Sequence, residues 1–195
     1  MNYKISSRDY LERAKQCLLK GDCQSLFYAT FEIRCGIEAR MQQYLEVQDH
    51  ISQKKREGWK VAKLASNIKD AFRLGDKDAV IRIRDQETNK VLLEARYTPV
   101  KKSLCKKAQK LGNFLHNAKK YYAPEDEHWI RLRHDLEEAV AELEQANSGR
   151  LLGPLLRHPD KKNIIMKLEV PTPEEREISK MIAVNEQLTI EVDYE

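Results

Sequence analysis

The chain has 195 residues, of which 41% are hydrophobic and 34% are charged. This length and apolar content suit one domain with a hydrophobic core, alone or with a small appendage. No run of eighteen or more apolar residues occurs, and the first residues lack the apolar stretch of a secretory signal. The sequence therefore predicts neither a membrane span nor export, and we expect a cytoplasmic protein.

The 35 basic and 31 acidic residues leave a net charge of +4, which permits a nucleic-acid partner without requiring one. Four cysteines occur, and none belongs to a Cys-x-x-Cys pair. Two of them, Cys17 and Cys105, lie beside predicted apolar stripes, which favours reduced, small apolar residues over disulfides or metal ligands. The sequence also lacks a phosphate-binding glycine loop, a nucleophile elbow and zinc spacing, so we expect no metal and no cofactor.

Two amphipathic helices are predicted at the start, over residues 7–20 and 24–47, and a short turn with Gly21 makes them antiparallel. Ser6 or Ser7 is expected to cap the first helix. Its apolar positions are Tyr10, Leu11, Ala14, Cys17 and Leu18. The stripe of the second helix is Leu26, Thr30, Ile33, Ile37, Met41 and Tyr44, which Phe27 and Phe31 are expected to widen.

Three further helices and one hairpin are predicted in the middle of the chain. A third helix is expected over about 59–74, and residues 47–56 either prolong the second helix or form a loop. Alternating patterns in 80–84 and 91–97 indicate a β-hairpin inserted at about 79–97. A fourth helix is expected to start at Thr98-Pro99 and to reach Tyr122, and a fifth runs from about 125 to Gly149.

The sequence pattern in the C-terminal segment is no longer mainly helical. Residues 150–160 contain Gly153, Pro154 and Pro159 and are predicted to be a linker. Alternating strands follow at 164–170 and 188–194, with a short helix between them that begins at Thr172-Pro173. These strands pair either with each other or with the hairpin. The sequence thus predicts a predominantly helical α+β protein, with a helical bundle over 1–149 and a β-α-β appendage after the linker in 150–195.

The predicted fourth helix carries a basic stripe opposite its apolar face, with His116 near the edge. Its candidate nucleic-acid-binding residues are Lys102, Lys106, Lys110, Asn113 and Lys120. Basic groups on a rigid helix suit phosphate binding. The alternative is a solvated face, and the next helix carries acidic residues expected to neutralise it, namely Glu137, Glu138, Glu142 and Glu144.

Two smaller clusters are also candidates. Arg34 and Glu38 lie four residues apart beside the apolar stripe of the second helix, where they form either an ordinary ion pair or a partly buried pair that orients another group. Arg131, Arg133 and His134 cluster on the fifth helix, with Arg131 and His134 on its outer side, either as surface residues or as a phosphate-binding group with an acid–base histidine.

Two segments together resemble proteins of the HEPN superfamily. The first, YLERA at residue 10, LLKGD at residue 18 and SLFYATFEIRCGIE at residue 25, is similar to the opening helix, glycine turn and second helix of that family. The second, KLGNFLH at 110–116, resembles the helix that carries the family's active site. The similarity spans about residues 5–47 and 104–143.

The resemblance implies a HEPN-like helical bundle that is often a homodimer. Many members are metal-independent RNases of toxin–antitoxin or phage-defence systems, with an arginine four to six residues before a histidine; others bind RNA or protein without catalysis. None of the five histidines here follows an arginine at that distance, and Lys110 before His116 is the nearest equivalent. Lysine keeps the charge but lacks the planar fork of arginine.

Two functional readings follow. The first is a non-catalytic HEPN-like protein that binds RNA or a protein partner, the latter through its β-elements. The alternative is an RNase acting at a dimer cleft, with His116 as general acid–base and Lys110 neutralising the scissile phosphate. We rank the non-catalytic reading first.

Overall fold

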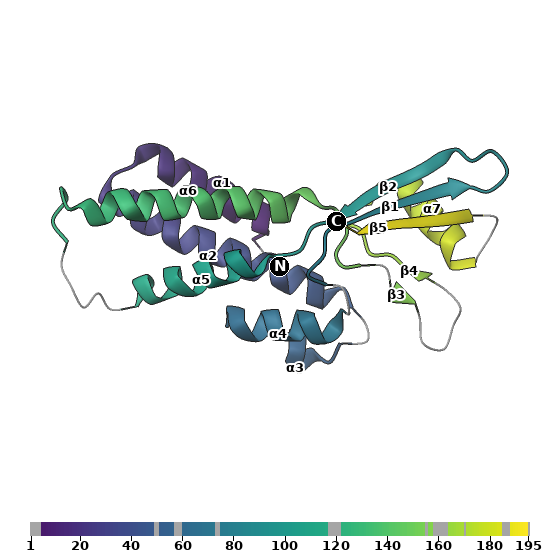
Figure 1. Ribbon diagram of the computed structural model, residues 1–195, viewed down its shortest axis with the longest axis horizontal. Helices are drawn as coiled ribbons and strands as arrows, with labels where there is room; N and C mark the ends of the chain where they lie inside the picture. The colour runs from purple at the N-terminus through teal and green to yellow at the C-terminus, as the bar shows by residue number, and fades with distance from the viewer. Residues whose placement is uncertain are drawn as a thin grey trace. The chain divides into compact units, whose positions relative to one another are not determined.

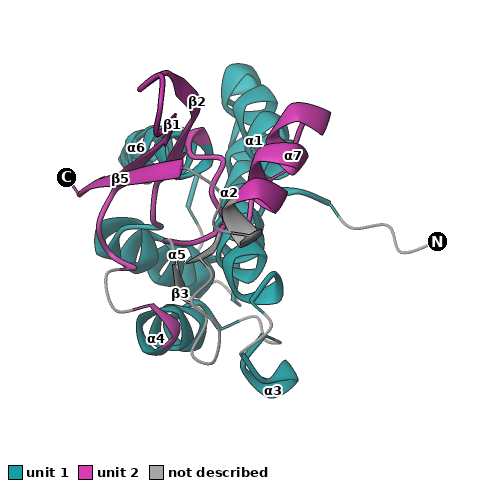
Figure 2. Ribbon diagram, turned by 90° about the vertical axis from the view of Figure 1, so that its right-hand side faces the viewer, with its two compact units in different colours: residues 1–70, 100–147 teal, residues 71–99, 148–195 magenta. Residues whose placement is uncertain are grey.

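The computed structural model describes residues 5–48, 51–56, 60–72, 75–116, 122–154, 156–157, 164–169, 171–184 and 188–194 (Figure 1). The chain forms two compact units, each made of two segments (Figure 2). The helical unit comprises residues 1–70 and 100–147, and the sheet unit comprises residues 71–99 and 148–195. The predicted α+β class with a predominance of helix is confirmed, and the predicted hairpin shares its unit with the C-terminal segment.

The helical unit opens with the predicted antiparallel pair, α1 (Ser7–Lys20) and α2 (Cys23–Glu46). Ser6 is the cap of α1, because its hydroxyl accepts from the N–H of Asp9 while the Asp9 carboxylate accepts from the N–H of Ser6. Gly21 ends α1 with a φ of 72°, a left-handed conformation that glycine adopts without strain. Asp22 then caps α2 through the N–H of Ser25 at 2.9 Å.

Two short helices follow, α3 (Gln53–Arg56) and α4 (Val61–Ala71). The predicted third helix therefore exists, although it is shorter than 59–74, and residues 57–59, 73 and 74 lie outside the described part of the chain. The Asn67 side-chain amide donates to the carbonyl of Lys55 at 2.8 Å, which ties α4 to α3.

The predicted fourth helix starts later than expected, as α5 (Lys102–Leu115). Thr98 does not cap it, because the Thr98 side chain is buried and its hydroxyl accepts from the N–H of Gly149 at 2.9 Å. The predicted start at Thr98-Pro99 is therefore wrong. Helix α5 ends at Leu115, and the predicted continuation through 117–121 lies outside the described residues.

Helix α6 (Glu127–Ser148) completes the unit close to its predicted bounds. Helices α1, α2, α5 and α6 share one core, and Gly36 of α2 lies so close to its neighbours that an added Cβ would be 2.9 Å from Leu143 and 3.2 Å from Tyr10. Fully buried positions of this core include Ala14, Ala29, Ile33, Ile37, Leu104, Ala108, Leu136 and Leu143.

The sheet unit contains a three-stranded antiparallel sheet with the order β2-β1-β5. The predicted hairpin is confirmed as β1 (Ala79–Asp85) and β2 (Val91–Tyr97), and β5 (Leu188–Tyr194) adds to the other side of β1. The sequence left two pairings open for the C-terminal strand, and the structure shows it paired with the hairpin. One face of the hairpin is buried, with Ile81 and Tyr97 both fully inaccessible.

The predicted strand over 164–170 is mostly irregular. Only β4 (Ile164–Ile165) is a strand, and it pairs with β3 (Leu156–Arg157) in the segment predicted to be a linker. Residues 166–169 bond instead to residues 150–152: the N–H of Leu152 donates to the carbonyl of Lys167, and the N–H of Glu169 donates to the carbonyl of Arg150. This backbone pairing with an irregular segment explains why the alternating pattern does not extend the strand.

Helix α7 (Pro173–Val184) begins where the sequence predicted. The Thr172 hydroxyl accepts from the N–H of Glu175 at 3.2 Å, and the Glu175 carboxylate accepts from the N–H of Thr172 at 2.8 Å. Arg150 also donates to both oxygens of Glu175, which is nearly buried, and this hydrogen bonding lowers the pKa of Glu175. Helix α7 is therefore fixed at its first turn to the segment that follows α6.

Candidate interaction surface of the helical unit

The predicted basic stripe of α5 divides into two parts. Lys110 points towards α6 and pairs with Asp135, and the neighbouring Lys107 reaches Glu138 at 2.6 Å and Glu142 at 2.8 Å. Lys102, Lys106 and Asn113 are exposed. Within the described residues, Lys102 and Lys106 form no ion pair, and Lys120 lies outside them. The predicted neutralisation of this helix by α6 thus occurs at Lys110 and at Lys107.

A groove runs between α5 and α6, and we call it the α5–α6 groove. It is lined by Lys110, Leu111, Phe114, His128, Arg131, Leu132, His134 and Asp135. This groove joins Lys110 to the predicted Arg131 and His134 cluster, which the sequence showed only as separate candidates. Both α6 side chains are exposed, as predicted, at 67% for Arg131 and 74% for His134.

The lysine and the arginine that line the α5–α6 groove each have a carboxylate partner, and His134 also lies near one. Besides the pair of Lys110 with Asp135, Arg131 lies 3.3 Å from Glu127, and His134 lies 3.5 Å from Glu138. A phosphate that entered the groove would have to displace these carboxylates. The groove therefore combines paired charges with the apolar side chains of Leu111, Phe114 and Leu132.

His116 lies apart from this groove. It follows the last residue of α5 in an extended conformation, with φ −78° and ψ 153°, and its side chain is exposed. It is not among the residues that line the groove, whereas Lys110 is. Of the predicted catalytic pair, Lys110 therefore lies on the lining of the groove and His116 does not.

Three aromatic side chains are exposed on consecutive turns of α2, and we call Phe27, Tyr28 and Phe31 the aromatic patch. Their exposed fractions are 40%, 50% and 48%. We expected Phe27 and Phe31 to widen the buried stripe, and this prediction is wrong. Helix α2 buries the side that carries Leu26 and Ile33 instead, so the two phenylalanines remain outside.

The aromatic patch continues into a cluster from α5 and α6. The ring centroids of Phe27 and Phe114 are 5.8 Å apart, and those of Phe114 and Trp129 are 6.3 Å apart in an edge-on arrangement. His128 stacks on Tyr122 with a centroid distance of 3.8 Å. These contacts hold Phe27 in place, so the patch is presented on a fixed support.

Arg34 and Glu38 form a partly buried pair on α2, next to α5. The Arg34 Nε lies 2.9 Å from the Glu38 Oε1, and the two side chains are only 15% and 16% exposed. Burial raises the pKa of Glu38, against the opposing hydrogen bond from Arg34. The pair therefore lies in a poorly solvated place, where each group depends on the other.

The Arg34 guanidinium occupies a space that α5 leaves open at Gly112. A Cβ at this position would lie 1.6 Å from Arg34 Nη1, which no side chain tolerates. Burial also raises the pKa of the nearby Cys35 thiol to about 11, and the charge of Glu38 adds to that shift, so this cysteine is not a reactive thiolate at neutral pH. The sequence indicated the pair by its spacing, but nothing in it indicated the role of Gly112.

Comparisons with known proteins give no relative: no protein-family model, no curated protein and no solved structure matches this chain. Among the described residues, no helix is long and apolar enough to span a membrane. The same part of the chain holds no group of three or more histidine, cysteine, aspartate or glutamate residues that is arranged for a metal ion.

Proposed function

We propose that the protein is a non-catalytic, HEPN-like interaction protein that dimerises through the aromatic patch. The observation that carries this proposal is the exposure of Phe27, Tyr28 and Phe31 together on one helix. Single exposed apolar residues are ordinary on a protein surface, but grouped aromatic side chains are typical of interfaces. The cytoplasm and a prokaryotic toxin–antitoxin or phage-defence setting belong to the same proposal.

The charges of the α5–α6 groove support binding of protein rather than phosphate. Lys110 and Arg131 are each compensated by a carboxylate, so the groove offers little net charge to a nucleic-acid backbone. An isologous contact, in which the same patch meets itself across a twofold axis, needs no net charge. Such a contact buries Phe27 and Phe31 of both copies in the centre of the interface, where aromatic side chains contribute most.

The test is the mass of the purified chain in solution, measured by size-exclusion chromatography with light scattering. We expect a dimer for the native chain and a monomer for Phe27→Ser with Phe31→Ser. Val91→Ser, which removes a side chain of similar exposure from the sheet unit, is the matched control and should remain a dimer. A native monomer, or a double variant that still dimerises with an unchanged circular dichroism spectrum, contradicts the proposal.

RNA binding or cleavage is the second candidate, because Lys102 and Lys106 are exposed on the same helix that His116 ends. In this reading the lysines hold the backbone, His116 is the general acid–base, and Lys110 leaves Asp135 to neutralise the scissile phosphate. Incubation with transfer RNA and total RNA, with chelator present, tests for metal-independent cleavage. Cleavage that survives His116→Ala excludes that site, and an RNA complex unaffected by Lys102→Ala with Lys106→Ala excludes the stripe.

A further inference from the structure

The outer edge of β5 is an open edge of the sheet. Strand β5 pairs with β1 along all seven of its residues, from Asp85 opposite Leu188 to Ala79 opposite Tyr194, without a register shift. Within the described residues no strand pairs with its other side. In an antiparallel ladder, alternate residues direct their N–H and C=O groups to that other side, so this edge presents backbone groups ready for pairing.

Strand β5 lacks several of the features that protect an edge. It contains no proline, no lysine and no bulge, whereas the β1–β2 pair has a register shift at Ile83 and Arg84. It is also as long as β1 and β2. Natural proteins usually interrupt such edges because they otherwise add a strand from another chain.

The apolar face of the sheet is incomplete beside β5. Ile81 and Ile83 in the central strand are 0% and 1% exposed. Their neighbours in β5, Ile190 and Val192, are only half-buried although they lie on the same face. A further strand beside β5 would cover these two side chains with its own apolar residues.

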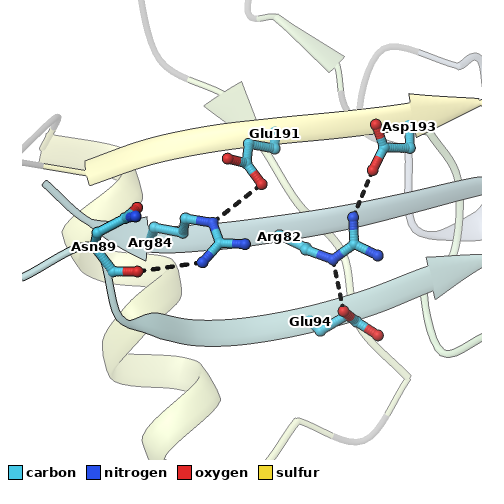
Figure 3. Close-up of polar contacts among 6 residues, drawn as sticks. All are labelled: Arg82, Arg84, Asn89, Glu94, Glu191 and Asp193. Carbon is cyan, nitrogen blue, oxygen red and sulfur yellow. Dashed lines mark hydrogen bonds and ion pairs between the residues drawn. The ribbon is translucent and has the colours of Figure 1, made fainter.

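On the opposite face of the sheet, arginines of the central strand β1 pair with acids of the neighbouring strands (Figure 3). Arg82 in β1 lies between an acid on each side, with Glu94 of β2 at 2.8 Å and Asp193 of β5 at 2.5 Å. Arg84 lies 3.1 Å from Glu191 of β5. The last strand of this face is therefore acidic, with Glu191 44% and Asp193 62% exposed.

From these observations we propose that the open edge of β5 binds an extended protein segment in which lysine or arginine alternates with apolar residues. The basic side chains of that segment lie beside Glu191 and Asp193 and continue the alternation of charge. Its apolar side chains cover Ile190 and Val192, while its backbone completes the ladder. This mode of binding is β-augmentation, in which the backbone supplies affinity and alternate side chains supply specificity.

A second copy of β5 is a poor occupant of this edge. Antiparallel pairing of two full β5 strands places Glu191 opposite Glu191 of the other copy, and four carboxylates then meet without a cation from either strand. Like charges directly opposite one another destabilise a sheet. The inference deepens the proposed interaction role but uses a surface on the other unit, separate from the aromatic patch.

The test uses the full chain and a fluorescein-labelled eight-residue peptide of alternating lysine and valine, with binding measured by fluorescence anisotropy. We expect saturable binding of this peptide and none of the matched glutamate–valine peptide. Two further versions carry N-methyl groups on alternate residues, one version on each backbone edge. Only the version methylated on the edge that faces β5 should lose binding, which distinguishes strand pairing from nonspecific attraction of a cation.

Glu191→Gln with Asp193→Asn should weaken binding about fivefold, since each facing charge pair contributes modestly. The Phe27→Ser, Phe31→Ser variant should bind the peptide as the native chain does, so failure of the dimer proposal is separable from failure of this one. Circular dichroism and thermal unfolding confirm that each variant is folded. The proposal is overturned by equal binding of the lysine and glutamate peptides, by equal effects of both methylation patterns, or by dimerisation through β5 itself.

Discussion

Replacing Gly112 by alanine tests whether the partly buried Arg34–Glu38 pair is fixed by contact with α5. The added methyl would lie 1.6 Å from Arg34 Nη1 and 2.7 Å from Arg34 Cζ. The guanidinium must therefore move away, because the backbone of α5 is held by its own helix. This movement separates Arg34 from the Glu38 carboxylate, which is 2.9 Å away in the native chain. It leaves that acid without its partner in a poorly solvated position.

The expected loss follows from two opposing contributions. A hydrogen bond to a charged group contributes about 1.5–3 kcal/mol when its partners are largely shielded from water, as these are. Alanine is favoured over glycine inside a helix by about 1 kcal/mol, which acts in the opposite direction. We therefore expect Gly112→Ala to lower the free energy of unfolding by about 0.5–2 kcal/mol.

The measurement is urea unfolding followed by circular dichroism at neutral pH, in the native background and in an Arg34→Ala background. Without the guanidinium, the methyl has nothing to displace, and Gly112→Ala should then stabilise the chain by up to about 1 kcal/mol through helix propensity. This change of sign is the decisive result. If Gly112→Ala destabilises both backgrounds equally, the contact with Arg34 is not what requires glycine at this position.

Two further predictions concern buried polar groups. Burial raises the pKa of Glu38 above 4.5, so the folded chain holds this proton more tightly than the unfolded chain and loses stability as pH rises from 4.5 through the raised value. Glu38→Gln should reduce this loss of stability with rising pH, and urea unfolding over a pH series measures it. If the free energy of unfolding of the variant depends on pH as that of the native chain does, another group is responsible. Thr98→Val removes the acceptor of the Gly149 N–H and should cost about 1–3 kcal/mol. Thr98→Ser, which keeps the hydroxyl, should cost clearly less in the same urea experiment.

Local patterns predicted most of the helices and strands, because helix caps and hydrophobic periodicity depend on residues that are close together in the sequence. Ser6, Gly21 and Thr172 are examples, since each acts on a backbone group within a few positions of itself. The same reasoning failed at Thr98, which has the local chemistry of a cap. Its hydroxyl bonds to Gly149, about fifty residues away in sequence, and no local signal reveals that competitor.

The candidate surface was harder to predict because the packing between helices decides which of its side chains are exposed and which are paired. The spacing of Phe27 and Phe31 shows that they share a face of α2, but their exposure depends on which side the other helices cover. Lys110 likewise belonged to a basic stripe in the sequence, and only the packing of α5 against α6 brings Asp135 to it. The pairing of β5 with β1 spans about a hundred residues, so alternation alone left its partner open.

The positive net charge of the chain is weak evidence for a nucleic-acid partner once the positions of the charges are known. In the sheet unit Arg82 pairs with Glu94 and Asp193, and on α5 the lysines that face α6 pair with its acids, as Lys107 does with Glu138. A protein that binds RNA through unpaired lysines releases counterions, so its affinity falls steeply with added salt. Contact through the aromatic patch depends on the burial of apolar surface, so added salt should weaken this contact little. The salt dependence of any complex the helical unit forms therefore separates the two functions without knowledge of the partner.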